Sequence, residues 1–203
     1  MRLLVGFIYT ETSMNNTNKL KAFALAFLVL TLVTAILLSF TLGLTHPLPW
    51  VFIVALIIVI ILNKKMTENQ FVIWKEEYSV GIESIDTDHK KLLQLINRLQ
   101  TSSIYQTGEA FDKEALDELV AYTKFHFARE EKMMEENGYP DFKDHKQQHV
   151  NMTDQVVNKI KAYEADHEKT IDDLLEYLKV WLINHINGTD KKYSAFLRDK
   201  GVK

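Results

Sequence analysis

Histidines and acidic residues recur after residue 85 at spacings that suit metal coordination. His126 and Glu130 lie four residues apart, and so do His145 and His149. Side chains four apart on a helix lie on the same face, so each pair presents two ligands one turn apart. A single metal ion can accept both members of such a pair.

The same histidines fall on the apolar faces of predicted helices. His89 follows Ile85 by four residues, and His185 follows Leu182 by three. A lone core histidine is usually just hydrogen-bonded, but several buried imidazoles and a carboxylate carry a large desolvation cost unless a metal pairs them. The predicted inward-facing set comprises His89, His126, Glu130, His145, His149 and His185.

Asp190 extends this set, because it follows His185 by five residues across Asn187-Gly188, where we expect the helix to break. Its carboxylate could then turn back toward His185, so we interpret it as a ligand rather than a helix cap. Five imidazoles and two carboxylates exceed the needs of one ion and indicate two bridged metals. The sequence has no cysteine, and a nitrogen and oxygen set in a helix bundle is typical of iron, with manganese as the substitute.

These ligands require long helices, and the region from residue 67 to 203 is predicted to be a domain built from them. Gly108 breaks one connection, Gly138-Tyr139-Pro140 ends a helix, and Gly188 is expected to close another. Short connections between helices of similar length predict an all-α, antiparallel up-down four-helix bundle. The expected helices cover residues 84–104, 112–137, 141–165 and 169–187, with a short fifth over 190–199.

Residues 1–66 have a different composition and are predicted to form a membrane region. Residues 22–44 carry no charge and are long enough to cross a bilayer as a helix, and residues 47–63 predict a second span. The turn between them is Thr45-His46-Pro47. The fold class is therefore a bundle preceded by a transmembrane helical hairpin, which contacts membrane lipid.

Lysines flank both apolar runs and predict the orientation of this hairpin. Lys19 and Lys21 precede the first run, and Lys64 and Lys65 follow the second. The positive-inside rule places both termini in the cytoplasm. We therefore expect a multi-pass protein of the inner, cytoplasmic membrane with the bundle in the cytoplasm, and no nucleic-acid partner.

Several motifs between Trp74 and Phe196 resemble the hemerythrin family, specifically its bacterial members. No single motif is specific, but the combination is. It comprises Val80-Gly81-Ile82 with Asp86-x-x-His89, His126-Phe127-x-x-Glu130-Glu131, Gly138-Tyr139-Pro140, His145-x-x-x-His149, and Trp181-Leu182-x-x-His185-Ile186-x-x-x-Asp190.

The resemblance implies two non-haem iron ions joined by an oxo or hydroxo bridge. His145, His149 and His185 would hold one iron, His89 and His126 the other, with Glu130 and Asp190 bridging both. The second iron would keep an open position for molecular oxygen. Asp88 departs from the family pattern, in which glutamine often precedes the first ligand, and this leaves the surroundings of His89 undefined.

The expected function is reversible oxygen binding, without catalysis, for oxygen storage, transport or delivery at the membrane. The expected recipient of delivered oxygen is an oxygen-using membrane or cytoplasmic partner protein. Two alternatives stay open. One is an oxygen or redox sensor acting through a partner, and the other is a diiron enzyme that oxidises iron or reduces peroxide or nitric oxide. The relatively few carboxylates weigh against oxygen-activating chemistry.

A few further residues are interpreted as structural. His46 and His167 fall in predicted connections, and Glu131, Glu135 and Glu136 are expected on a solvated helix face. Trp181 is assigned to packing. Leu182 is either an ordinary core leucine or a wall of the oxygen pocket.

Overall fold

The computed structural model describes residues 16–105, 107–165 and 171–202, and every regular element within them is helical. The all-α prediction is therefore confirmed for this part of the chain. The chain divides into two compact units, with the division between Lys65 and Met66. The predicted start of a helix at residue 169, and His167, lie outside the described residues.

The first unit contains two apolar helices joined by a turn. Helix α1 (Asn16–Ser39) continues into a short 3-10 helix, Phe40–Leu42, and α2 covers Pro47–Glu68. Gly43 ends the first helical run with a positive φ of 105°. The second helix extends beyond the predicted residue 63 because the following lysines, methionine and glutamate favour helix and no glycine or proline interrupts them.

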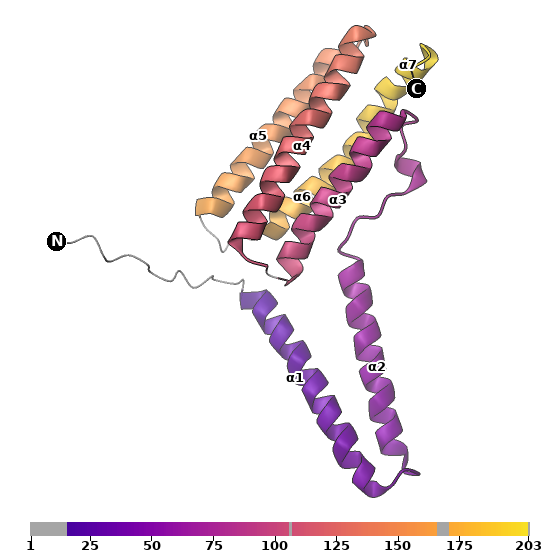
Figure 1. The fold of residues 1–203 in the computed structure, drawn as a ribbon, viewed down its shortest axis with the longest axis vertical. Helices are drawn as coiled ribbons and strands as arrows, with labels where there is room; N and C mark the ends of the chain where they lie inside the picture. Colours follow the sequence, from indigo (N-terminus) through magenta and orange to yellow (C-terminus); the bar gives the residue numbers. More distant parts are fainter. Residues whose placement is uncertain (1–15, 106, 166–170, 203) are drawn as a thin grey trace, which may run out of the picture. The chain divides into compact units, whose positions relative to one another are not determined.

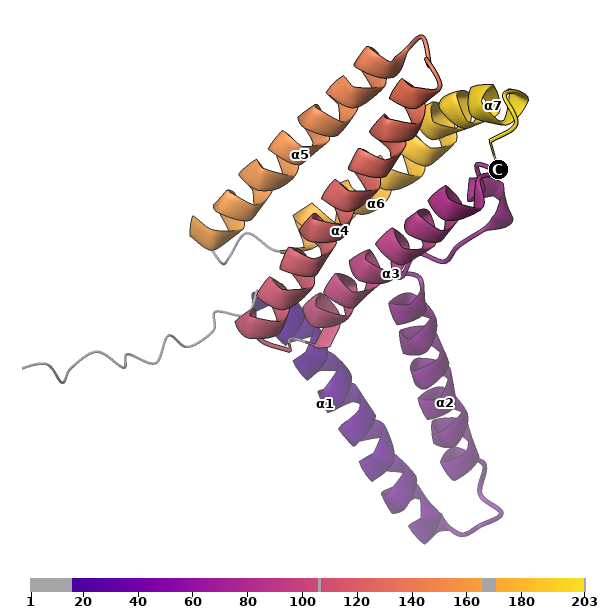
Figure 2. The same ribbon diagram turned by 45° about the horizontal axis from the view of Figure 1, so that its top comes forward.

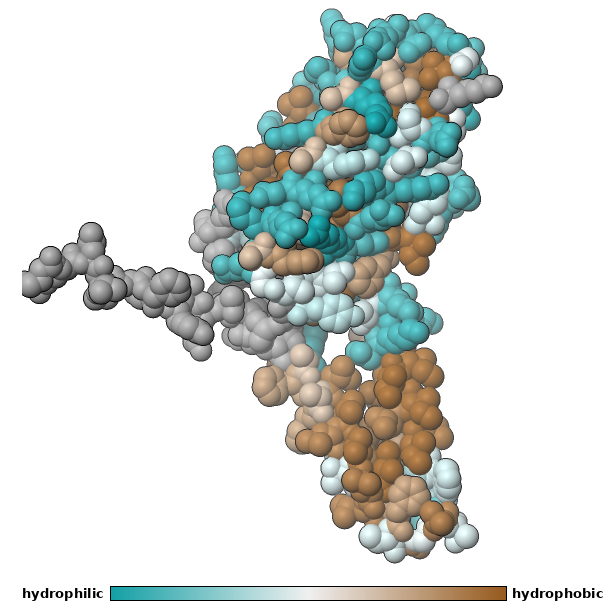
Figure 3. Space-filling view, in the orientation of Figure 1, coloured by the Kyte–Doolittle hydropathy of each residue, from teal (hydrophilic) through white to brown (hydrophobic). Residues whose placement is uncertain are grey.

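These two helices expose apolar side chains along most of their length. Phe23 is 75% exposed and Phe27 is 72% exposed, and hydrophobic residues predominate on the surface of both helices in Figure 3. By length and composition, Leu20–Leu42 and Pro47–Glu68 could each cross a membrane.

The connection between them is held by local contacts. The Trp50 indole donates a hydrogen bond to the Leu44 carbonyl (3.1 Å) and packs edge-on against Phe40, with ring centroids 6.4 Å apart. The backbone N–H of Leu48 donates to Nδ1 of His46 (3.3 Å). His46 thus serves the start of α2, in keeping with its interpretation as a turn residue.

The second unit is the helix bundle (Figures 1 and 2). Each of its four long helices contacts two of the others, because α3 contacts α4 and α6, and α5 contacts the same two. Successive helices run in opposite directions in both views. The four helices are α3 (Glu83–Tyr105), α4 (Glu109–Glu136), α5 (Phe142–Ala165) and α6 (Ile171–His185).

The C-terminal end of α6 corrects one prediction. The chain does not break at Asn187-Gly188; it forms a π-helical turn over Ile186–Asp190 and continues into α7 (Lys191–Asp199). Gly188 lies inside this turn and is not among the glycines with a positive φ. In an α-helix, a residue five positions along lies about 140° away around the axis. The wider i→i+5 turn returns Asp190 to the face of His185.

The segment before α3 is also attached to the bundle, which the sequence did not indicate. Asn97 exchanges two hydrogen bonds with the backbone of Val72 (2.9 and 2.7 Å). Asp86 accepts hydrogen bonds from the Ser79 hydroxyl (2.5 Å) and the Val80 N–H (2.8 Å). These bonds fix the first turn of α3, one turn before His89.

Candidate metal centre

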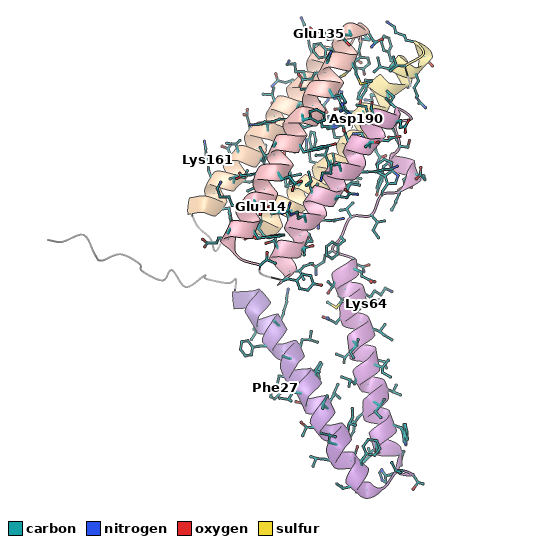
Figure 4. All side chains as sticks on the ribbon, in the orientation of Figure 1. Phe27, Lys64, Glu114, Glu135, Lys161 and Asp190 are labelled. Carbon is teal, nitrogen blue, oxygen red and sulfur yellow. The ribbon has the colours of Figure 1, made fainter. Side chains whose placement is uncertain are left out.

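All seven predicted ligand residues lie together inside the bundle, contributed by α3, α4, α5, α6 and the π-helical turn. None exposes more than 4% of its surface. Figure 4 labels Asp190 among the bundle helices, and Glu135 near the end of α4. The seven residues are His89, His126, Glu130, His145, His149, His185 and Asp190.

His145, His149 and His185 form a three-histidine group. Nε2 of His149 lies 3.0 Å from Nε2 of His145 and 3.1 Å from Nε2 of His185. Two nitrogens bound at right angles to one ion at about 2.1 Å would be roughly 3 Å apart. The three ring nitrogens therefore already have the separation expected for ligands of one metal.

His89 and His126 form a two-histidine group, brought together from α3 and α4. Their ring centroids are 4.9 Å apart. Nε2 of His126 lies 3.5 Å from Oε2 of Glu130, and Nε2 of His89 lies 3.8 Å from Oε1. With Glu130 this pair forms a second potential metal site, separate from the three-histidine group.

Two carboxylates connect the groups. Asp190 places Oδ1 3.0 Å from Nε2 of His185 and Oδ2 3.3 Å from Nε2 of His89. Glu130 places Oε2 3.3 Å from Nε2 of His149 and also faces the two-histidine group. Each carboxylate therefore touches both groups, as a bridging ligand between two ions would.

The unpaired polar atoms give an independent test of whether cations fit here. Buried polar atoms are normally hydrogen-bonded. Among the described residues, several buried atoms of this cluster have no hydrogen-bond partner. They are both ring nitrogens of His89 and His126, Nδ1 of His145, Oε2 of Glu130 and both carboxylate oxygens of Asp190. The donor set thus fits a pair of metal ions.

The carboxylates keep their charge in spite of burial. Burial and Glu130 both act to raise the pKa of Asp190, but His185 and His89 outweigh them and lower it to about 2. Burial likewise opposes ionisation of Glu130, yet the neighbouring histidines hold its pKa well below the ordinary value. Burial lowers the pKa of His149, which favours the neutral imidazole that binds metals.

Aromatic residues fix two of the imidazole rings. Phe127 stacks on His149 with centroids 3.7 Å apart, and Trp181 stacks on His185 at 4.3 Å. Trp181, assigned to packing from the sequence, therefore packs directly on a candidate ligand. Such stacking limits ring rotation and holds Nε2 toward the cluster.

Two residues of the site were missed or misplaced by the sequence reasoning. The Tyr193 hydroxyl donates a hydrogen bond to Oε1 of Glu130 (2.5 Å). The sequence analysis did not identify Tyr193, because it is not part of any of the histidine and carboxylate spacings. Glu131 is not simply solvated, since its Oε1 lies 3.2 Å from Nδ1 of His149. No signal in the sequence indicates this contact, because it depends on how α5 packs against α4. Glu135 and Glu136 are exposed as expected.

A small apolar cavity lies one helical turn from the histidines. It measures about 10 Å³, close to the volume occupied by one water-sized sphere. Two lining side chains carry a polar group, Trp181 and Thr123, and the Thr123 hydroxyl is already bonded to the Leu119 carbonyl (2.8 Å). The lining of the cavity is therefore mostly apolar. Its lining comprises Leu92, Ile96, Leu119, Thr123, Phe127, Met152, Leu178, Trp181 and Leu182.

Comparison with known proteins agrees with this geometry. The family model described as the hemerythrin HHE cation binding domain matches residues 80–197, which is more than half of the chain. The chain belongs to the hemerythrin family. The match begins after the helical hairpin, so the family assignment concerns the bundle.

Individual hemerythrins match the same share of the chain. Bacteriohemerythrin of Stenotrophomonas maltophilia is 35% identical over 122 residues, covering 60% of this chain and 78% of that protein. Myohemerythrin of Theromyzon tessulatum is 33% identical over 124 residues, covering 61% of this chain and 92% of that protein. A crystal structure of wild-type hemerythrin superposes with a TM-score of 0.55 at 28% identity, covering 61% of this chain and 95% of that one.

Proposed function

We propose that the chain binds molecular oxygen reversibly at two non-haem iron ions, for oxygen storage, transport or delivery at a membrane. The observation that carries the proposal is the cluster of five buried imidazoles bridged by two buried carboxylates. The names of the hemerythrin relatives support it. In this proposal the protein is a binder and not an enzyme.

The ligands divide between the two ions along the groups described above. The three-histidine group would hold one iron and the two-histidine group the other, with Glu130 and Asp190 shared. The second ion would have fewer protein ligands and thus room for oxygen. Iron bound here, with an oxo or hydroxo bridge, would supply the electrons that bound oxygen takes up.

The protein's own residues would set the conditions for that exchange. Tyr193 donates its hydroxyl proton to a hydrogen bond with Oε1 of Glu130, so it holds this carboxylate in the bridging orientation. The apolar lining of the cavity, including Leu182, excludes water from the space nearest the histidines. Water exclusion would protect the iron-binding residues from side reactions with solvent.

The hairpin would anchor this site to the inner membrane. Two apolar helices of sufficient length support the proposal, and their exposed side chains suit contact with lipid. Lys21, Lys64 and Lys65 lie at the ends opposite the turn, which favours a cytoplasmic location for both termini and for residues 67–203. A partner that consumes the delivered oxygen would lie at the same membrane.

The test of oxygen binding is a visible spectrum of the full-length protein in detergent, loaded anaerobically with ferrous iron. A charge-transfer band that appears with oxygen and fades when oxygen is removed is the expected result. His149→Ala should abolish the band, while His46→Ala, which changes a histidine of the turn, should leave it unchanged. Irreversible oxidation of the wild-type protein without such a band would contradict the proposal.

The same sample separates binding from catalysis. Stoichiometric uptake of about one oxygen per iron pair supports the carrier, whereas continued consumption of added ferrous iron or hydrogen peroxide would identify an enzyme. Topology is tested separately in intact cells with a membrane-impermeant maleimide, since the chain has no native cysteine. Thr45→Cys should be labelled directly, and Lys161→Cys only after permeabilisation.

A further inference from the structure

Two carboxylates outside the seven candidate ligands face the far side of candidate ligand rings. Oδ2 of Asp88 lies 3.5 Å from Nδ1 of His126. Oε1 of Glu131 lies 3.2 Å from Nδ1 of His149. His126 belongs to the two-histidine group and His149 to the three-histidine group, so each group has one histidine with a carboxylate behind it.

Each of these carboxylates is paired with a basic side chain. Nη1 of Arg129 lies 3.1 Å from Oδ2 of Asp88, and Nζ of Lys146 lies 2.8 Å from Oε2 of Glu131. Two series of contacts, each from a histidine through a carboxylate to a basic side chain, therefore lead away from the candidate metal centre. We name the first, His126-Asp88-Arg129, the Asp88 relay and the second, His149-Glu131-Lys146, the Glu131 relay.

The two relays differ in burial. Asp88 exposes only 2% of its side chain, whereas Glu131 exposes 20%. The Tyr122 hydroxyl adds a hydrogen bond to Asp88 (2.7 Å). A charge in a less hydrated environment interacts more strongly with its neighbours, so the Asp88 relay is expected to have the larger effect on its histidine.

The outward-facing nitrogens of two other candidate ligands lack such a partner. Nδ1 of His89, His126 and His145 all lack a hydrogen-bond partner among the described residues, but of these three nitrogens only Nδ1 of His126 has a carboxylate oxygen within 4 Å, that of Asp88. Asp88, although it directly precedes His89, thus acts on His126. Asp88, which departs from the family pattern, therefore lies beside His126 and not beside His89, the candidate ligand that follows it in the sequence.

We propose that Asp88 and Glu131 are positioning residues, one for each metal, that direct Nε2 of His126 and His149 toward the ions and increase the electron density on these rings. The proposal rests on the proposed function, because it requires two metals. A carboxylate facing Nδ1 fixes the proton on that nitrogen and leaves the lone pair of Nε2 free for the metal. Its negative charge also favours the more oxidised metal, and it thereby facilitates electron donation to oxygen.

The test uses full-length protein in detergent and three isosteric substitutions. Asp88→Asn and Glu131→Gln remove the carboxylate charges of the two relays, and Glu135→Gln removes the charge of an exposed glutamate on α4, the helix of Glu131. For each variant, the affinity for ferrous iron is measured by anaerobic titration, and the midpoint potential of the loaded centre by spectroelectrochemistry. The conservative Asp88→Glu variant serves as a rescue.

We expect Asp88→Asn to weaken iron binding by about 10- to 100-fold, the usual range for such partners of ligands, and to raise the midpoint potential. Glu131→Gln should act in the same direction but less, Glu135→Gln should match the wild type, and Asp88→Glu should recover most of the potential. Wild-type affinity and potential in both Asp88→Asn and Glu131→Gln would overturn the proposal.

The outcomes remain distinguishable from failure of the oxygen-binding proposal. If the wild-type protein binds no iron, the proposed function fails and not only the relays. Circular dichroism of each variant shows whether the bundle is folded. Should Asp88→Asn fail to fold, the partly exposed Glu131 still gives a decisive result, since an unchanged potential in Glu131→Gln would then refute the role of the relays.

Discussion

The hairpin and the bundle distribute polar and apolar side chains in opposite ways. The hairpin exposes Phe23, Phe27 and most of its other large apolar side chains. The bundle buries five imidazoles and two carboxylates completely or nearly so. In water, both arrangements are unfavourable, because the first leaves apolar surface hydrated and the second removes charges from solvent.

Each unit therefore requires a different complement. The outward apolar surface of the hairpin suits a lipid phase, whereas the inward carboxylates of the bundle suit cations. The two requirements are independent, so a change that disrupts one should leave the other intact. The following predictions test this independence.

Removal of metal should have the largest effect, and only on the bundle. A ligand that binds the native state alone stabilises it by roughly 4 kcal/mol when its free concentration is a thousand times its Kd. Chelation of iron should therefore increase amide hydrogen exchange throughout α3 to α6 by mass spectrometry, with exchange in α1 and α2 unchanged in detergent. Equal deprotection of α1 and α2 would show that the units are coupled.

The second-largest expected effect comes from a charge introduced on an exposed apolar position, which should affect the hairpin and not the bundle. Val54 in α2 and Val180 in α6 are matched in exposure, at 55% and 54%. Arginine at the centre of a membrane span costs about 2.5 to 3.5 kcal/mol, whereas an exposed position in a soluble bundle tolerates it within about 0.5 kcal/mol.

Val54→Arg should accordingly reduce the membrane-bound fraction, measured by fractionation and immunoblotting, while Val180→Arg leaves it unchanged. Neither variant should alter the visible spectrum of the iron-loaded bundle. Retention of Val54→Arg in the membrane at wild-type levels would count against α2 as a span.

Tyr193→Phe should have a smaller effect, confined to the metal centre. It removes the hydroxyl that bonds to Glu130, and hydrogen bonds to charged groups contribute about 1.5 to 3 kcal/mol. We expect weaker ferrous iron binding in anaerobic titrations. Tyr105→Phe, a change at an exposed tyrosine, is the matched control, and equal loss in both variants would argue against a specific role of Tyr193.

Lowering the pH should destabilise the metal-free bundle and not the hairpin. This effect is the smallest at neutral pH, where it is absent. The depressed pKa of Asp190 means that its contribution to apoprotein stability is fully present above its ordinary pKa of 3.8 and is lost as the pH falls toward about 2. The metal-free bundle should therefore become less stable in this window, and Asp190→Asn should show a weaker pH dependence there.

The hairpin provides the internal reference for this titration. Between Leu20 and Leu62 it has no acidic residue, so the helicity of α1 and α2 should persist over the same range. The measurement is hydrogen exchange resolved by region at pH 4 and pH 2. Identical acid sensitivity of wild type and Asp190→Asn would contradict the assigned role of this carboxylate.

The sequence predicted most of the fold and the candidate ligands, because helical periodicity determines both. Three- and four-residue spacings place His126 with Glu130 and His145 with His149 whatever the details of the backbone. The spacing could not predict the π-helical turn, since the break expected at Gly188 would also have returned Asp190 to the site. Asp190 lies beside His185, as predicted, but a π-helical turn and not a helix break places it there.

Contacts between separate elements were also beyond the sequence. Asp88 lies next to His89 in the chain but faces His126, because Tyr122 and Arg129 of α4 hold its carboxylate. Glu131 looked solvated within its own helix, but α5 brings His149 and Lys146 to it. Such contacts depend on how helices pack, and periodicity within one helix does not specify them.

The π-helical turn also determines which way the side chains of α7 face around the helix axis. It accommodates one more residue than an α-helical turn of the same kind, so α7 is rotated relative to a continuous α6. That rotation brings Asp190 to His185 and His89, and Tyr193, three residues later, to Glu130. Deletion of a single residue between Ile186 and Thr189 would therefore turn both side chains away together. The site thus depends on chain length at this point as much as on residue identity.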